Sequence, residues 1–212
     1  MPNWCNNNIT ISGDEGTIRT LTAVLKSIKT SDEEQSNNVF QSLIGLPQHM
    51  SDGDYKEKWY DTNIEWFGTK WDISYSEDMF TFTKGEISFF CETAWSPPIP
   101  FLQNLCEMYK VNANLFYSEG GVGFSGESTF NWVDGELEVY DDECGYLEGI
   151  YKYSREEFWS EVESRVDCIL DEEQTLEDFI SEFDFVSEED KEELTRLYNE
   201  TINNNDEESE GE

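Results

Sequence analysis

The sequence predicts an α+β fold, in which a small sheet with packed helices is followed by an acidic helical region. Up to about residue 150, short stretches of alternating apolar and polar residues are interleaved with stretches of helical period. Only the helical period continues after that point. The charge also divides the chain, since residues 119–212 contain 32 Asp and Glu against 5 Lys and Arg, whereas residues 1–118 contain 16 against 8.

Length and composition set the broad class of the protein. The 212 residues are enough for one or two domains with a hydrophobic core. Aromatic residues make up 15% of the chain, which is too many for a wholly disordered acidic protein. The five cysteines include no C-x-x-C pair, so we expect reduced, mostly buried thiols. No stretch is apolar over the roughly 20 residues that cross a bilayer, and we expect a cytosolic protein without membrane contact.

The first elements follow from a change of period. Ile9 and Ile11 alternate with polar residues before Gly13, which predicts a strand over residues 7–12. Asp14 then begins a helix. The apolar face of this helix consists of Ile18, Leu21, Leu25 and Ile28.

The next segment combines a loop with an insertion. Residues 30–38 are polar and predict a loop, and residues 40–47 form a small apolar island that we expect to pack as an insertion. Residues 54–66 are aromatic and charged, and they predict one or two helical turns.

A period of two then returns and predicts further strands. Successive apolar positions are Trp71, Ile73 and Tyr75, then Phe80 and Phe82, then Ile87, Phe89 and Cys91. Prolines 97 and 98 end the last of these strands and begin a helix. The stripe of that helix is Phe101, Leu102, Leu105, Met108 and Tyr109, and Ala113, Leu115 and Tyr117 alternate as the next strand.

A hairpin and three helices complete the chain. Asp134-Gly135 between two alternating stretches predicts a tight turn. Ser154, Leu176 and Ser187 mark the beginnings of three acidic helical stretches. We therefore predict an α+β domain with a hairpin extension over residues 1–150, an acidic helical region over 151–202 and a disordered tail over 203–212.

The order β-α-β-β-α-β of the first six elements is the split βαβ, or ferredoxin-like, arrangement. Four motifs lie at the ends of these elements: MPNWCNN (1–7), WFGTKWD (66–72), ETAWSPP (92–98) and EGGVGFSG (119–126). Over about residues 1–130, this set resembles the YubB-type ferredoxin-like family of conjugative plasmids and bacteriophages. The resemblance implies a ferredoxin-like fold and a mobile-element origin in a bacterial host. It implies no established reaction and no catalytic residues, and it leaves out the acidic helices.

Two of these motifs indicate a pocket. They lie at strand ends in the predicted fold, so their side chains are expected to meet there. The residues are Trp66, Lys70, Trp71, Asp72, Glu92 and Trp95. An aromatic pocket with one lysine suits a small anionic or planar ligand. The alternative is that the tryptophans fill the interface between sheet and helices and that Lys70 pairs with an acid.

The residues give no sign of catalysis, a metal or a cofactor. Asp141-Asp142-Glu143 lacks the spacing of a calcium loop, and His49 is the only histidine, without a recognisable nucleophile beside it. The glycines of 120–126 lead into strand-like residues, whereas the dinucleotide fingerprint leads into a helix. We therefore expect a non-enzymatic protein without a metal or cofactor.

The charge indicates the kind of partner. A net charge of −35 repels nucleic acid and anionic membrane, and the 13 Lys and Arg are scattered. Helices dense in acids approximate the charge density of DNA and suit a basic groove. The favoured hypothesis is an accessory protein that inhibits a host defence or nucleic-acid-handling complex; the alternative is a protein that sequesters a small ligand. The partner-binding acids are predicted to be Glu156, Glu157, Glu161, Glu163, Asp171, Glu172 and Glu173. The sequence leaves the oligomeric state open.

Overall fold

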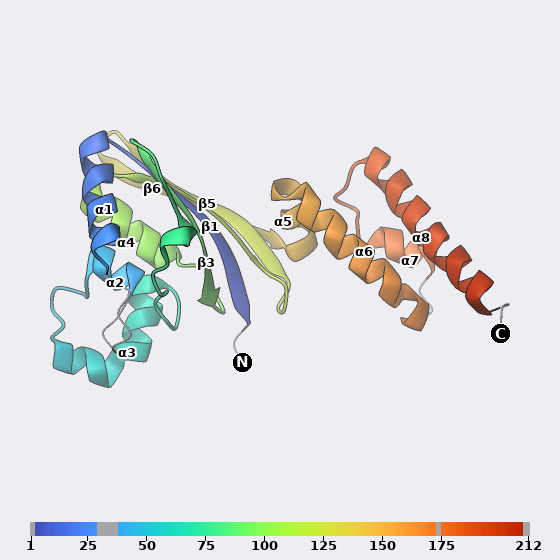
Figure 1. The fold of residues 1–212 in the computed structure, drawn as a ribbon, viewed down its shortest axis with the longest axis horizontal. Coiled ribbons are helices and arrows are strands. Elements are labelled where there is room, and N and C mark those ends of the chain that lie inside the picture. The colour runs from blue at the N-terminus through green and yellow to red at the C-terminus, as the bar shows by residue number, and fades with distance from the viewer. Residues whose placement is uncertain (1–2, 29–37, 173–174, 210–212) are drawn as a thin grey trace. The chain divides into compact units, whose positions relative to one another are not determined.

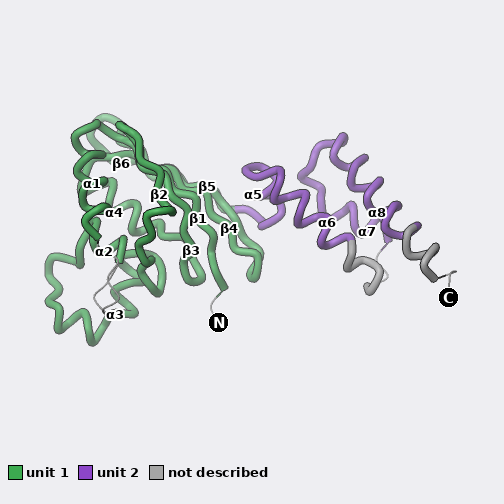
Figure 2. Tube along the Cα trace, viewed as in Figure 1, with its two compact units in different colours: residues 1–143 green, residues 144–212 purple. Residues whose placement is uncertain are grey.

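The structure of the chain is a computed structural model. It describes residues 3–28, 38–172 and 175–209, apart from the side chains of 167–172 and 204–209. It divides into two compact units, unit 1 (residues 1–143) and unit 2 (residues 144–212), which are coloured separately in Figure 2. The division falls just before helix α5 (Tyr146–Tyr153) and not at residue 150. The reason is that Ile150 is fully buried in the core of unit 2.

Unit 1 contains one six-stranded sheet with the order β2-β3-β1-β4-β5-β6. The strands are β1 (Trp4–Ser12), β2 (Phe80–Phe82), β3 (Glu86–Ala94), β4 (Asn112–Glu119), β5 (Phe124–Val133) and β6 (Glu136–Gly145). Strand β1 pairs antiparallel with both β3 and β4, and β3 also pairs antiparallel with β2. The strands β1 and β2 of the first βαβ unit have β3 between them, and the strands β3 and β4 of the second unit have β1 between them. This is the predicted split βαβ arrangement.

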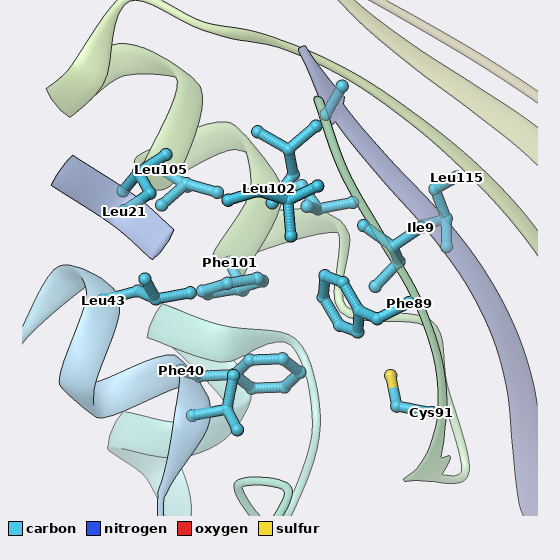
Figure 3. Packing of buried hydrophobic residues seen from close by; sticks show 14 of the residues in the cluster. Ile9, Leu21, Phe40, Leu43, Phe89, Cys91, Phe101, Leu102, Leu105 and Leu115 are labelled. Carbon is cyan, nitrogen blue, oxygen red and sulfur yellow. The ribbon is translucent and has the colours of Figure 1, made fainter. Parts of the chain in front are cut away.

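Helices cover one face of this sheet (Figure 1). They are α1 (Glu15–Ser27), α2 (Val39–Ile44), α3 (Asp52–Phe67), the short 3₁₀ helix η1 (Glu77–Met79) and α4 (Ile99–Tyr109). Strand residues Ile9, Phe89 and Leu115 point toward the helices, as Figure 3 shows. Phe40 of α2 stacks on Phe101 of α4 with ring centroids 4.1 Å apart. The apolar island after the predicted loop is thus a helix within the main core.

The predicted hairpin is confirmed. Asp134 and Gly135 both have positive φ, 53° and 89°, as a two-residue turn of type I′ requires. Strand β6 is one of the two edge strands of the sheet, and its many acids discourage pairing with another strand.

Unit 2 consists of α5 and the three helices that follow it, α6 (Arg155–Glu172), α7 (Leu176–Ser181) and α8 (Glu188–Ser209). Its core is aromatic, and Phe158, Phe179 and Phe183 are fully or almost fully buried. The pattern analysis missed α5, because Gly149 weakens the helical signal of a short segment. Helix α8 runs to Ser209, so the predicted tail begins as a helix; once formed, a helix extends at little cost through polar residues.

The predicted strand over Trp71, Ile73 and Tyr75 is wrong, and Ile73 does not lie in the sheet. This segment makes a single isolated bridge, between Ser74 and Asn38. The predicted loop over 30–38 lies outside the described residues, except for Asn38.

Asp72 explains the difference, because its carboxylate binds the beginning of α2. Its oxygens accept hydrogen bonds from the backbone N–H of Phe40 and Gln41, both at 2.8 Å, and of Ile73 at 2.7 Å. The N–H groups at a helix N-terminus have no partners within the helix, so a carboxylate there stabilises it. Removal of this carboxyl from water raises its pKa from 3.8 to about 6, although the N–H donors oppose the shift.

We expect Asp72→Ala to lower the free energy of unfolding by about 2 kcal/mol, because it leaves the N–H groups of α2 without acceptors. Asp78→Ala is the matched control, since Asp78 carries the same charge on an exposed residue of η1. Urea denaturation measures both changes. Equal effects of the two substitutions would contradict the capping role.

The pH dependence of Asp72 gives a second prediction. Because its folded pKa of about 6 exceeds the unfolded value of 3.8, Asp72 adds stability as the pH falls through this interval and loses it as the pH rises through 6. A ¹³C NMR titration of the carboxyl carbon measures the midpoint directly. A midpoint below 3.8 would show that the N–H donors outweigh burial.

Candidate functional site

Three of the four sequence motifs meet directly at one end of the sheet, where β1 begins and β3 ends. The backbone N–H of Trp95 donates to the carbonyl of Asn3 at 3.0 Å, which joins the first motif to the third. Thr69 of the second motif is fully buried and contacts the last residue of β3 through its side chain. Its hydroxyl accepts from the N–H of Ala94 at 3.0 Å and lies 3.2 Å from the carbonyl of Ala94.

Buried polar groups fix the same end from within. The amide nitrogen of Asn7 lies 2.7 Å from the carbonyl of Cys5 and 2.9 Å from the hydroxyl of Thr93. In the fourth motif, the buried Glu119 accepts a hydrogen bond from the N–H of Gly121 at 2.8 Å. A Cβ on Gly121 would lie 2.6 Å from the side chain of Asn3, so this glycine allows the fourth motif to reach the first.

The most distinctive chemistry at this end surrounds Lys70. Its ammonium lies 4.4 Å from the ring centroid of Trp71, 4.9 Å from that of Trp95 and 6.0 Å from that of Tyr60. These are cation–π distances. The ring of Trp4 adjoins that of Trp71, with centroids 6.1 Å apart, and Trp71 adjoins Trp95 at 6.4 Å.

We call Trp4, Lys70, Trp71 and Trp95 the tryptophan site. The three indoles are not core residues, since Trp4 is 47%, Trp71 38% and Trp95 40% exposed. Trp95 has a φ of 71°, a strained region for a large side chain. The local structure therefore holds an exposed aromatic surface in place.

Of the six residues predicted for a pocket, the structure brings Lys70, Trp71 and Trp95 together. Trp66 instead packs against the core, and its Nε1 donates to the carbonyl of Gly45 at 3.0 Å. Asp72 caps α2. Glu92 lies exposed on β3, opposite Asn6 of β1.

A groove of ≈ 410 Å³ lies beside the tryptophan site and shares Trp71 with it. Its other lining residues are Asn38, Tyr55, Lys56, Trp59, Asn63 and Asp72. The amide of Asn63 shapes the groove, because it accepts from the Tyr55 hydroxyl at 2.9 Å and donates to the carbonyl of Lys70 at 2.9 Å.

Sequence reasoning missed Trp4, Tyr60 and Trp59 as members of this region. Trp4 carried a usable signal, because alternation along β1 places it on the face opposite the buried Cys5. Tyr60 and Trp59 carried none, since they are brought here by the packing of α3.

Unit 2 has a second groove, of ≈ 630 Å³, along α6 and α8. It is lined by Trp159, Glu163, Glu189, Asp190, Glu192, Glu193, Arg196 and Leu197. We call it the acidic groove. Glu163, Glu189 and Glu192 are exposed and have no hydrogen bond or ion pair with any residue that the structure describes.

The other acids of this groove have internal partners. Asp190 accepts hydrogen bonds from the Arg155 guanidinium at 3.0 Å and the Tyr151 hydroxyl at 2.7 Å. The Arg155 guanidinium holds the pKa of the Asp190 carboxyl well below its usual range. Glu193 pairs with Arg196, Nε to Oε2 at 2.9 Å. These pairs fix α8 and leave the exposed acids as the free charges of the groove.

The seven acids predicted to bind a partner are not equivalent. Glu163 lines the acidic groove and Glu156 is exposed. Glu161 pairs with Arg165 at 3.1 Å, and the nearby Glu157 helps to raise the pKa of Tyr146 to about 12, mainly an effect of burial. The side chains of Asp171 and Glu172, and all of Glu173, lie outside the described residues. Sequence reasoning missed Glu189 and Glu192, which α8 brings opposite α6.

The remaining described groups that could carry chemistry are thiols, an acid of β6 and the histidine. Burial raises the pKa of the Cys5 and Cys106 thiols to about 12. Asp141 accepts from the Ser128 hydroxyl at 2.6 Å, and His49 is exposed. The described residues contain no group of three or more His, Cys, Asp or Glu placed to hold a metal ion. Among them, no helix is both long and apolar enough to cross a membrane.

Comparison with solved structures found a likeness to a protein api92 from Yersinia pseudotuberculosis. The identity is 9% and the TM-score 0.37, over 69% of this chain and 98% of that chain. The comparison with curated proteins found no match. The YubB-type name and the mobile-element origin therefore stay predictions.

A family model described as the ferredoxin-like domain in Api92-like protein matches residues 70–199. The matched range includes α5, α6, α7 and the first part of α8, so the acidic helices, which the motif resemblance left out, are part of the matched domain. The expectation of a ferredoxin-like α+β fold is confirmed. Since the model matches more than half of the chain, the chain belongs to the family of ferredoxin-like domains in Api92-like proteins.

Proposed function

We propose that the chain is a non-enzymatic accessory protein of a bacteriophage or plasmid. It inhibits a host defence or nucleic-acid-handling complex by binding a basic groove of that complex through unit 2. The observation that carries this proposal is the acidic groove, whose lining combines the exposed and unpaired Glu163, Glu189 and Glu192 with the apolar side chains of Trp159 and Leu197.

The charge balance of unit 2 supports the proposal. Residues 144–212 contain 24 Asp and Glu against 5 Lys and Arg. All five basic side chains already form ion pairs within the unit. Most of the acids therefore have no internal counter-charge, and their mutual repulsion is relieved when a basic surface approaches. A mixed-sign surface would serve solubility equally well, so solubility alone does not explain this excess.

The shape of the acidic groove adds to the charge. Trp159 is half-buried and, with Leu197, adds apolar side chains to a lining that also contains carboxylates. Long basic side chains present an apolar stem and a charged end, and this combination matches both parts of the groove. Tryptophan is also enriched among residues that dominate binding energy.

The non-enzymatic assignment is part of this proposal, and the surroundings of the described thiols and buried acids support it. Burial raises the pKa of the Cys5 and Cys106 thiols, and the buried acids Glu119 and Asp190 are held by N–H, guanidinium or hydroxyl donors. A catalytic acid, base or nucleophile needs a group that is free to react.

We expect Glu163→Gln, Glu189→Gln and Glu192→Gln together to weaken partner binding by about tenfold or more, because they remove charge and keep side-chain size. Partners captured from bacterial lysate by the full chain are quantified for both proteins. Binding by the unchanged chain should fall between about 0.05 and 0.5 M salt, since the Debye length shortens.

The control substitutes three exposed glutamates of unit 1, Glu77→Gln, Glu107→Gln and Glu138→Gln, and so makes the same change in net charge. This control should retain binding. If both triple variants bound equally well, or if salt had no effect on the captured partner, the acidic groove would not be the binding surface.

A further inference from the structure

We propose that the tryptophan site of unit 1 binds a small planar molecule that carries an anionic group, of the chemical class of a nucleoside monophosphate. This inference concerns unit 1 alone. It is independent of the partner surface proposed for unit 2, and either can fail without the other.

The position of Lys70 is the first support. In a chain with 48 acids, every ion pair between described residues lies in unit 2, and Lys70 has none. Its half-buried ammonium rests on ring faces and donates to no acceptor among the described residues. A phosphate or carboxylate would therefore gain charge-assisted hydrogen bonds without displacing an internal carboxylate.

The aromatic surface is the second support. Trp4, Trp71 and Trp95 present a nearly continuous wall of exposed indole, with neighbouring ring planes tilted by only 39° and 33°. Contiguous exposed apolar surface is a feature of ligand-binding grooves and interaction sites. A flat heteroaromatic ring would stack on it and be removed from water.

The adjoining groove is the third support. Its ≈ 410 Å³ lies within the range of roughly 300–1,000 Å³ that small-molecule sites occupy. Trp59 and Trp71 line it together with the cation of Lys56 and the carboxyl group of Asp72. The oxygens of Asp72 already accept hydrogen bonds from backbone N–H groups, so Lys56 is the charged group of this lining without an ion pair among the described residues. Trp71 belongs to both features and connects the groove to the Lys70 ammonium.

These features select the ligand class. A quaternary ammonium, which aromatic cages also bind, would meet the ammonium that Lys70 already places over the same rings. A nucleic-acid strand would bring many phosphates to a chain of net charge −35, in which the 13 Lys and Arg are scattered along the sequence. A single planar ring with one anionic group needs only the lysine and the indoles that are present.

The test is an NMR titration of the ¹⁵N-labelled full chain, observed at the indole N–H signals. The probes are adenosine monophosphate, adenosine and inorganic phosphate, of which the last two each lack one half of the proposed ligand. We expect adenosine monophosphate to shift the signals of Trp71 and Trp95. The signals of Trp66 and Trp132 should stay, because their Nε1 groups donate to the carbonyls of Gly45 and Cys106, both at 3.0 Å.

Lys70→Met should weaken binding of adenosine monophosphate by about tenfold or more, and Lys70→Arg should largely retain it. The matched control is Lys110→Met, since the Lys110 ammonium also lies over an indole, that of Trp132 at 3.8 Å, and belongs to the same unit. This control should bind as the unchanged chain does. Unchanged signals of Trp66 verify that each variant is folded.

Three results would overturn the proposal. The first is the absence of shifts at Trp71 and Trp95 at about 1 mM adenosine monophosphate. The second is equal binding of adenosine and adenosine monophosphate, or equal binding by the unchanged chain and Lys70→Met. The third is binding of choline that becomes tighter in Lys70→Met, which would assign the rings to an external cation.

Discussion

The excess of acidic side chains is the constraint on which the rest of the structure depends. A carboxylate removed from water destabilises a fold unless donors surround it, and each such group here is used to fix a junction. Glu119 closes the turn after β4, Asp72 holds the beginning of α2, and Asp190 joins α8 to Arg155. The other described acids are at least partly exposed, where water and salt screen them.

The basic side chains of the two units differ in their contacts. In unit 1, Lys26, Lys70 and Lys110 lie over aromatic rings. In unit 2, every basic side chain forms an ion pair, so the remaining acids of that unit have no counter-charge of their own. Unit 1 therefore offers a cation on an aromatic surface, whereas unit 2 offers unpaired acids in a groove that Trp159 and Leu197 also line. The two proposed binding surfaces follow from this difference.

Much of the fold could be predicted from the sequence, because it depends on local periodicity. The hairpin turn at Asp134-Gly135 and the paired strands β1, β3 and β4 have strong local signals. Ile73 was misassigned because a contact distant in sequence, from Asp72 to α2, determines the conformation of its segment. For the same reason, pattern analysis found Lys70, Trp71 and Trp95, which are adjacent to motifs, but not the residues that α3 and α8 contribute to the grooves.

The central claim is that unit 2 occupies a basic surface that would otherwise bind nucleic acid. Competition with duplex DNA tests this claim most directly. The captured host partner is bound to the full chain, and its release is measured as DNA is added at constant ionic strength. The account predicts that DNA and the chain exclude one another from the partner. Simultaneous binding of DNA and the chain to one partner molecule would contradict it.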